Sequence, residues 1–494
     1  MNVYAERERD WRCGPLVYQV LVDRFAPSAR LEEKRALYAA PRRLRGWDEE
    51  PKKGRYLAEH RVWSHELEFW GGDLASARDR LDALQALGVD VVYLNPIHDA
   101  FTNHKYDARD YAEVAPELGT RADVAALAAD LHRRGMRLVL DGVFNHVGWR
   151  CPWFARAQAG EAPWRDWFVL GPEYPDGYRC WANARNLPEL RLEAPDLRAA
   201  LWGDPQSVVQ RTLREGVDGW RLDVAYDLGP EFLAELTAAA HRAKPDALTV
   251  GEVYNVPTRW LGPLDAVMNM SARELILRLV RGQLAPALCA RHLERLVGDA
   301  PFEGLLRSWL VLDNHDTARL ATQLPEAWQR ALAQTLQFTL PGAPQLYYGV
   351  EAGLEGGVEP ASRGPMRWER AVAGNPEFDR VRALSALRRA RRGLRVGDYL
   401  PLDAEACLAF ARQTERAQDT AIVVVNPGAR EVRETLWLRD SWLMHTSTLR
   451  CALSGAQGRV IAGVLELAVP AHSARVLFPE RPAGPGYSAT KRVP

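Results

Sequence analysis

The sequence has few cysteines, no net charge and no long hydrophobic run. Six cysteines are spread over 494 residues without a C-x-x-C pair, which argues against a zinc site or a disulfide framework. Basic and acidic residues balance at 64 each, so the positive field that nucleic acid or an anionic membrane surface attracts is missing. No stretch approaches the roughly 18 apolar residues of a membrane span. These absences argue against nucleic-acid and membrane partners.

The N-terminal residues carry no export signal. Residues 1–13 are charged and lack the apolar stretch of a signal peptide, so we predict a cytoplasmic protein. Hydrophobic residues make up 47% and charged residues 26% of the chain, which is ordinary for folded domains. The length allows two or three domains.

Apolar runs alternate with helical patterns over the first four-fifths of the chain. The runs are 16–25, 89–95, 137–143, 217–224, 247–252, 264–269, 308–314 and 343–348. Between them, Thr120 precedes an apolar stripe and is placed to cap a helix, and Gly88 follows another stripe and is placed to end one. Parallel neighbouring strands need helical crossovers, so the pattern predicts an α/β fold, a (β/α)8 TIM barrel.

The pattern breaks at two places. Residues 148–194 form a long connection rich in Trp, Tyr and Gly, which predicts an inserted subdomain after the third strand. Beyond residue 396 the runs become short and β-like, at 406–412, 420–426, 432–438, 458–468 and 473–478, which predicts a C-terminal antiparallel β-sandwich. The predicted division is a barrel of 1–147 and 195–395, subdomain 148–194, sandwich 396–480 and a flexible tail 481–494.

Three acidic residues stand at the ends of predicted barrel strands. They are Asp223, Glu252 and Asp316. A carboxylate at the tip of an apolar run is costly to place for packing reasons, because a charge belongs in water. One such residue alone is more often a helix cap or an ion-pair partner. Three, each followed by loop-like sequence, predict a carboxylate-lined pocket, and paired carboxylates are the chemistry of glycosidic bond cleavage.

The residues around Asp223 and Glu252 suggest opposite roles for these two carboxyls. Arg221 and Asp223 are two residues apart on a strand and face the same side, so the guanidinium is expected to lower the pKa of Asp223 and keep it ionised. Glu252 must instead be protonated, and neighbouring negative charge is expected to raise its pKa from ~4.3 toward roughly 6–7. Two carboxyls about 5–5.5 Å apart would cleave with retention of configuration.

Four segments resemble the signature segments of the α-amylase family of retaining α-glycoside hydrolases, glycoside hydrolase family 13. They are Asp141–His146, Gly219–Asp223, Gly251–Val253 and Asn314–Asp316. Further segments resemble the neopullulanase, cyclomaltodextrinase and maltogenic amylase branch: Phe69–Leu74, Asn103–Asp107, and Tyr347–Gly349 with Glu359, Pro360 and Arg363. The resemblance covers most of the chain.

The resemblance implies a role for each matching residue. Asp223 would be the nucleophile, Glu252 the general acid and base, and Asp316 the group that grips the sugar hydroxyls. The remaining residues would bind substrate: Arg221, His146 and His315 by hydrogen bonds, Tyr106 by stacking, Asp141 as a brace, and Glu359 and Arg363 at the next glucose unit. Relatives usually have Asp where this chain has Glu359. Standing alone, His146 or His315 would more often be a core histidine, and Asp141 fits a purely structural role as well as a functional one.

The resemblance also implies the activity, which is cleavage of α-1,4-glucosidic bonds in maltodextrins or cyclodextrins without an organic cofactor. Relatives bind calcium with a loop after the first strand and the Asp at position 73, but residues 25–30 offer few oxygen ligands here, so no metal is expected. The branch usually carries an extra N-terminal domain that forms a dimer. Here the first strand pattern begins at residue 16, so a monomer is expected rather than a dimer.

Two other functions fit the same residues. A transglycosidase would pass the covalent intermediate to a sugar hydroxyl, and an aromatic residue such as Tyr226 on the acceptor side would favour that route. A non-catalytic α-glucan-binding relative would keep the fold, although such proteins typically lose catalytic carboxylates. The Trp cluster of residues 149–181 is compatible with a sugar platform, but for any one member the subdomain core is the simpler assignment.

Overall fold

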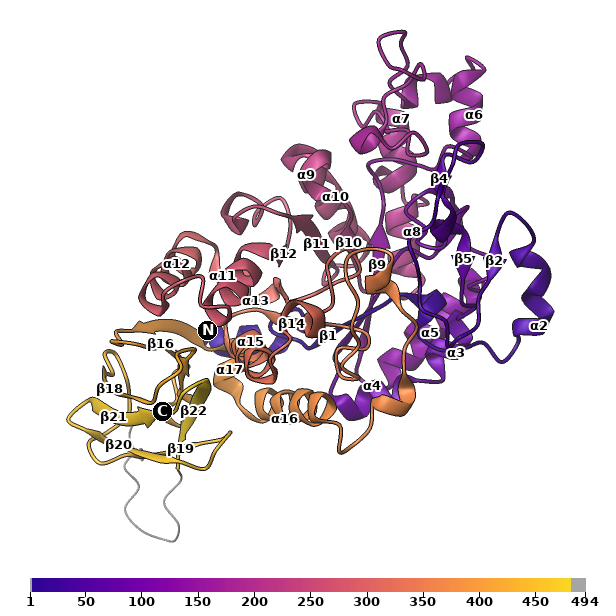
Figure 1. The fold of residues 1–494 in the computed structure, drawn as a ribbon. Helices are drawn as coiled ribbons and strands as arrows, with labels where there is room; N and C mark the ends of the chain where they lie inside the picture. Colours follow the sequence, from indigo (N-terminus) through magenta and orange to yellow (C-terminus); the bar gives the residue numbers. More distant parts are fainter. Residues whose placement is uncertain (1, 481–494) are drawn as a thin grey trace.

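The centre of the protein, described by a computed structural model for residues 2–480, is a closed barrel of eight parallel strands (Figure 1). The strands are β1 (Val17–Val20), β6 (Val91–Leu94), β9 (Arg137–Gly142), β10 (Gly219–Leu222), β11 (Leu248–Val253), β12 (Ala266–Asn269), β13 (Trp309–Val311) and β14 (Ala343–Tyr347). They pair in the order β1-β14-β13-β12-β11-β10-β9-β6 and close on β1. Each strand coincides with a predicted run, so the barrel prediction is confirmed.

Apolar side chains fill the interior of the barrel. The buried interior set is Val17, Val91, Tyr93, Val139, Leu248, Val250, Ala266, Met268, Met270, Trp309, Val311 and Ala343. A barrel packed in this way has no open channel, so a ligand can be bound only at an end. The strand ends and the loops that follow them are therefore where a site has to be built.

Helices cover the outside of the barrel, as the alternating pattern predicts. They are α3 (Leu74–Arg78), α4 (Leu81–Leu87), α5 (Arg121–Arg133), α8 (Val208–Arg214), α9 (Ala225–Leu228), α10 (Pro230–Ala243), α11 (Met270–Val280), α12 (Pro286–Asp299), α13 (Phe302–Arg307), α14 (Leu320–Gln323), α15 (Ala327–Thr339), α16 (Pro376–Ala390) and α17 (Arg392–Val396). Thr120 caps α5 through the amide of Asp123, and Gly88 ends α4 with a φ of 91°. Helix α1 (Val3–Arg9) precedes the first strand.

The connection after β9 folds around its own aromatic core. It contains α6 (Pro152–Gln158), the short helical turns η4 (Trp164–Trp167) and η5 (Trp181–Asn183), and is followed by α7 (Pro195–Arg198). Phe154 packs edge-on against Phe168 and Tyr178, with ring centres 5.1 and 4.7 Å apart. A backbone bridge between His146 and Glu189 fastens this segment to the loop after β9. Figure 1 shows it, with α6 and α7, at one end of the molecule.

A second long connection, between β1 and α3, was not foreseen from the sequence. It holds α2 (Leu31–Lys34) and two small sheets. Strands β2 (Arg43–Leu44) and β5 (Glu68–Phe69) pair in parallel, and β3 (Tyr56–Leu57) and β4 (Val62–Trp63) form an antiparallel hairpin. A further hairpin, β7 (His98–Ala100) with β8 (Ala108–Val114), follows β6. All but β8 have only two or three residues, too few to leave a periodic pattern, and the seven residues of β8 do not alternate between buried and exposed.

The C-terminal residues form one antiparallel sheet of eight strands that packs against α12 and α15 (Figure 1). The strands are β15 (Asp398–Leu402), β16 (Leu408–Gln413), β17 (Ala421–Asn426), β18 (Val432–Trp437), β19 (Thr448–Cys451), β20 (Gln457–Ile461), β21 (Val464–Val469) and β22 (Ser473–Pro479). Side chains of β17 and of β21 share one buried core, so the sheet folds over on itself as a sandwich does. Strands β15 and β19 were missed, and the run 458–468 is the two strands β20 and β21.

Two expectations have no structural outcome. The domain limits at 147/148, 194/195 and 395/396 stay predictions, and the predicted tail lies outside the described residues. Within residues 2–480 no helix combines the length and the hydropathy that crossing a membrane requires.

The interior packing predicts a large cost for emptying it. Trp309 is fully buried and its ring centre lies 5.1 Å from that of Tyr93. We expect Trp309→Ala to lower the free energy of unfolding by about 3–5 kcal/mol, because it leaves a cavity in a closed barrel, measured by urea unfolding. The matched control is Trp437→Ala, whose side chain is 63% exposed and whose loss is expected to change stability by less than about 0.5 kcal/mol. Equal effects of the two substitutions would contradict the assignment of the interior.

Candidate active site

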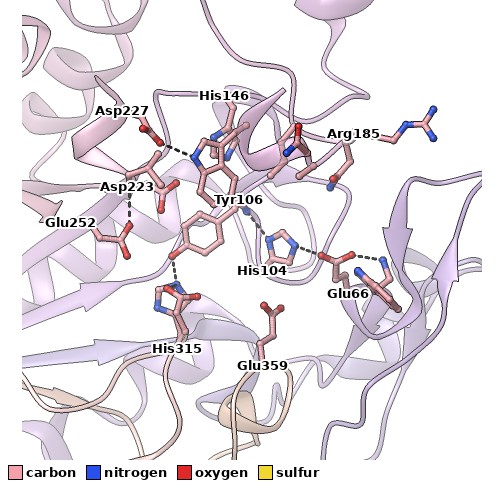
Figure 2. Close-up of a pocket in the computed structure, with 18 of the residues that line it drawn as sticks. Glu66, His104, Tyr106, His146, Arg185, Asp223, Asp227, Glu252, His315 and Glu359 are labelled. Atoms are coloured by element: carbon pink, nitrogen blue, oxygen red, sulfur yellow. Dashed lines mark hydrogen bonds and ion pairs between the residues drawn. The ribbon is translucent and has the colours of Figure 1, made fainter. Parts of the chain in front are cut away.

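The carboxyl ends of the barrel strands open into a cavity of about 1030 Å³. The cavity is lined by most of the residues that the sequence marked: Tyr106, His146, Asp223, Glu252, His315, Asp316, Glu359 and Arg363. Asp141 and Arg221 lie just below its floor, where both are fully buried. The structure therefore brings every predicted site residue to one place. Figure 2 labels Tyr106, His146, Asp223, Glu252, His315 and Glu359 among them.

One buried guanidinium organises the floor of the cavity. Nη1 of Arg221 lies 2.9 Å from Asp141 and 3.0 Å from Asp223, and Nη2 lies 2.9 Å from Glu252. The sheet register sets this arrangement, because Arg221 on β10 pairs with Asp141 on β9 and with Val250 on β11. Asp223 and Glu252 therefore contact the two terminal nitrogens of the same group, side by side.

The turn after β10 adds a second link between the two carboxyls. Val224 has a left-handed backbone with a φ of 39°, which is rare for a β-branched residue and marks a constrained position. In that conformation its amide donates a hydrogen bond of 3.1 Å to Oε2 of Glu252. The backbone that follows Asp223 thus also holds Glu252 in place.

Burial favours the protonated forms of Asp223 and Glu252. Burial raises the pKa of Asp223 well above its usual value although Arg221 opposes the shift, and the charge of Glu252 adds to it. Burial also raises the pKa of Glu252, again against Arg221 and reinforced by Asp316. Arg221 lowers the pKa of Asp223 as expected, but the expectation of a net lowering was wrong, because burial outweighs one guanidinium that serves three carboxyls. The two groups titrate together and share a proton to a higher pH than free carboxyls would.

Asp316 has the opposite character. Burial alone would raise its pKa, but contacts with His315 and Arg363 lower the pKa of Asp316 below its usual value. His315 Nε2 lies 3.1 Å from one of its oxygens, and Arg363 Nη2 lies 3.1 Å from the other. Arg363 also contacts Glu359 at 2.7 Å. Asp316 is thus an ionised acceptor on the wall of the cavity.

Tyr106 and the two histidines form a polar and aromatic wall. The Tyr106 ring stacks on His315 with centres 5.3 Å apart, and its hydroxyl lies 3.0 Å from Asp141 and 2.6 Å from His315. Burial lowers the pKa of both His146 and His315 to about 3, so both rings are neutral donors and acceptors at physiological pH. Nε2 of His146 is buried and has no hydrogen-bond partner within residues 2–480, which leaves it available to a ligand in the cavity.

Several residues of the cavity were given no role from the sequence. Glu66 and His104 contact each other at 3.2 Å, and His104 Nδ1 accepts from the Tyr106 amide. Tyr56, Trp63 and Tyr254 also line the wall. A pattern of apolar periodicity cannot find them, because they belong to short loops and hairpins.

Trp181 faces the cavity, unlike Trp153 and Trp167 in the same insertion. It stacks on His146 with ring centres 5.3 Å apart, and its indole nitrogen donates to Asp227 at 2.9 Å (Figure 2). Trp153 and Trp167 instead pack on each other inside the subdomain, with centres 5.0 Å apart. Composition located the Trp cluster, but which member faces the cavity depends on the turn at η5.

A family model for the catalytic domain of α-amylase matches residues 19–382. The chain belongs to the α-amylase family. A cyclomaltodextrinase from a Bacillus species is 36% identical over 373 residues, which are 72% of this chain and 66% of that protein. Neopullulanase 2 of Thermoactinomyces vulgaris is 33% identical over 379 residues, 74% of this chain and 64% of that protein. The resemblance to this branch is thereby confirmed, while the matched region spans about two thirds of each relative's length.

Solved structures agree over nearly the whole chain. The cyclic α-maltosyl-(1→6)-maltose hydrolase of Arthrobacter globiformis superimposes with a TM-score of 0.79 at 28% identity, covering 95% of this chain and 100% of that one. The shared part therefore includes the barrel, the insertion and the C-terminal sheet.

Asp73, which the resemblance marked as a possible calcium ligand, is already engaged by protein groups. Asp73 caps α3 through the amide of Ser76 at 2.7 Å, and its other oxygen lies 2.7 Å from Nζ of Lys34. The same ammonium contacts the main-chain oxygen of Glu117 at 3.0 Å. A lysine cation at the carboxylate repels a divalent ion, and no cluster of three metal-ligating side chains occurs in the part of the chain that the structure describes.

This contact predicts metal-independent stability. We expect EDTA and added calcium each to leave the Tm within about 1 °C, because the ammonium of Lys34 already balances Asp73. Lys34→Met is expected to lower the free energy of unfolding by about 1–3 kcal/mol, since it leaves a mostly buried carboxylate without its partner. The control is Lys52→Met at an exposed position. A calcium-dependent rise in the Tm of the unaltered protein would contradict the prediction.

Proposed function

We propose that the protein is a retaining glycoside hydrolase that cleaves α-1,4-glucosidic bonds of maltodextrins or cyclodextrins. The observation that carries the proposal is the contact of Asp223 and Glu252 with the same guanidinium, at the floor of a cavity walled by Tyr106. Relatives named cyclomaltodextrinase and neopullulanase support the substrate class. So does the solved complex of the Arthrobacter hydrolase with maltose.

The first half of the reaction uses both carboxyls. The ionised Asp223 attacks the anomeric carbon and forms an ester bond to the sugar, while the bond from that carbon to the leaving oxygen breaks. Glu252 gives its proton to the leaving oxygen. The proton that burial retains on the pair supplies this acid, and Arg221 stays in contact with both groups as charge moves from Asp223 to Glu252.

The second half reverses these roles. Glu252, now ionised, takes a proton from water, and the resulting hydroxide attacks the anomeric carbon and displaces Asp223. Two displacements on one carbon restore the original configuration, and both carboxyls return to their starting state. Asp316, His146 and His315 face the cavity where the hydroxyls of that sugar would lie, and the Tyr106 ring would pack on its apolar face.

The remaining expectations stand as parts of the same proposal. The substrate is an α-glucan oligosaccharide, the protein is a monomer in the cytoplasm, and nucleic acid is not a partner, which the balanced charge supports. Light scattering of the purified chain would give the oligomeric state directly.

The decisive test follows the first anomer released. Maltoheptaose and β-cyclodextrin are the substrates, and NMR is expected to show the α-anomer first, because two displacements retain configuration. Asp223→Asn is expected to lower kcat by at least about 10⁴-fold, since the nucleophile is lost, and to keep maltoheptaose binding in calorimetry.

Three outcomes would change the assignment. A β-anomer released first would defeat the retaining mechanism. Products longer than the substrate would indicate a transglycosidase. An unaltered protein that binds maltoheptaose without cleaving it would indicate a binding module. As a control, Asp227→Asn changes a carboxylate of the same cavity that lies outside the proposed pair, and its kcat is expected to fall far less.

The shared proton predicts a bell-shaped pH dependence. Activity requires one carboxyl ionised and the other protonated, so it is lost below the lower and above the higher pKa of the pair. Because burial raises the pKa of Glu252, the alkaline limb is expected above the ordinary glutamate value of 4.5. The measurement is kcat/KM against pH, where His146 and His315 contribute no limb in the neutral range.

The control removes the acid. In Glu252→Gln, formation of the ester from α-maltosyl fluoride needs no proton donor because fluoride leaves unaided, and kcat/KM reports that step rather than the later hydrolysis, which still lacks its base. The alkaline limb is expected to disappear with this substrate. Its persistence in Glu252→Gln would assign the limb to another group.

A further inference from the structure

One wall of the cavity is an aromatic hairpin from outside the barrel proper. Tyr56 on β3 and Trp63 on β4 are directly paired across the hairpin, with ring centres 5.7 Å apart and planes at 69°. Both line the same cavity as the catalytic carboxyls. Their side chains are 42% and 41% exposed, so two large apolar rings stand partly in water beside a proposed sugar site.

The folding of the hairpin does not explain these two rings. Its buried core consists of Val62, Leu67 and Phe101, with Leu57 packed against them. Tyr56 and Trp63 are not part of that core: they pack on each other, and Trp63 also contacts the His65 ring and the Lys53 ammonium. Exposed aromatic rings in a cavity are suited to the apolar C–H faces of glucose units, because each ring covered by a sugar removes apolar surface from water.

A chain of contacts fixes the position of the hairpin relative to the reaction centre. The amide of Trp63 donates to Glu66, Glu66 lies 3.2 Å from His104, and His104 accepts from the amide of Tyr106. Figure 2 shows Glu66 and His104 on one side of Tyr106, and Glu252 on the other. Because Glu252 is the proposed proton donor to the leaving oxygen and lies across Tyr106 from the hairpin, we infer that the hairpin faces the sugars that would stay attached to Asp223.

The tip of the hairpin is anchored to the inserted subdomain. Arg61, with a left-handed φ of 58°, lies over the Trp149 ring at 4.5 Å and donates to the Tyr178 hydroxyl. It also lies 3.8 Å from Asp176. The rings are thus held against two parts of the molecule, a preorganisation that lowers the entropic cost of binding.

We propose that Tyr56 and Trp63 form a platform for the glucose units beyond the one that reacts, and that it makes the protein prefer longer α-glucan chains. Arg61 acts through the platform as a positioning residue. The inference rests on the proposed function for the direction of the chain, while the binding that it describes needs no turnover.

Binding in an inactive background tests the platform directly. With Asp223→Asn in place, Trp63→Ala is expected to weaken maltoheptaose binding about tenfold, the value for losing roughly 50 Å² of apolar contact. Maltotriose, which has fewer glucose units to place on the platform, is expected to change less than about twofold. Tyr56→Ala is expected to act in the same direction, and calorimetry gives both affinities.

The matched control is Trp437→Ala, an exposed Trp on β18 that is absent from the lining of the cavity. Its loss is expected to change neither affinity. Equal weakening of both sugars by Trp63→Ala, or no weakening of either, would overturn the platform. Selective weakening in a protein that proves catalytically inactive without the Asp223 change would support the platform and overturn the proposed function instead.

Kinetics of the active protein test the positioning role. Arg61→Ala is expected to raise KM for maltoheptaose several-fold with kcat within about twofold, because uniform binding is lost and the reacting groups are untouched. Arg61→Lys is expected to restore part of the affinity by keeping the cation over Trp149. A fall in kcat with KM unchanged would contradict a role at the platform.

Discussion

The charge of Arg221 is the interaction on which the site depends. A buried carboxylate is costly, and three lie around this one guanidinium. Removing the cation would leave several negative charges in the barrel floor without compensation. The sheet register makes the arrangement possible, because β9, β10 and β11 are neighbours and put Asp141 directly opposite Arg221. The strand register that builds the barrel is therefore the same register that places the carboxylates around Arg221.

Electrostatics divide the carboxyls into two groups. Asp223 and Glu252 share a guanidinium and keep a proton because burial raises the pKa of each. Asp316 has its own cation in Arg363, which helps to lower its pKa. Burial thus favours a proton on the two carboxyls that acid catalysis would use, while Asp316 stays ionised. The neutral histidines add hydrogen bonds without adding charge.

The barrel supplies the reacting groups, and other segments supply most of the walls. Trp181 comes from the insertion after β9, and Tyr56 and Trp63 come from the connection after β1. Arg61 joins these two segments through Trp149. Loops on a rigid scaffold are where binding specificity usually resides. Lys34 shows the same division, since a side chain of that connecting segment pairs with Asp73 at the start of α3.

By itself, the sequence was enough to determine the eight barrel strands, the helices between them and the identity of the clustered site residues, because strand and helix periodicity and short motifs are local properties. The tertiary structure decided what depends on distant neighbours. The pKa of Asp223 rises rather than falls because burial and three further carboxyls, those of Glu252, Asp141 and Asp316, act on it together. Trp181 faces the cavity while Trp153 does not, and the hairpin of Tyr56 and Trp63 is placed by Arg61 and Glu66. Such contacts join residues that are remote in sequence, so the local sequence pattern cannot predict them.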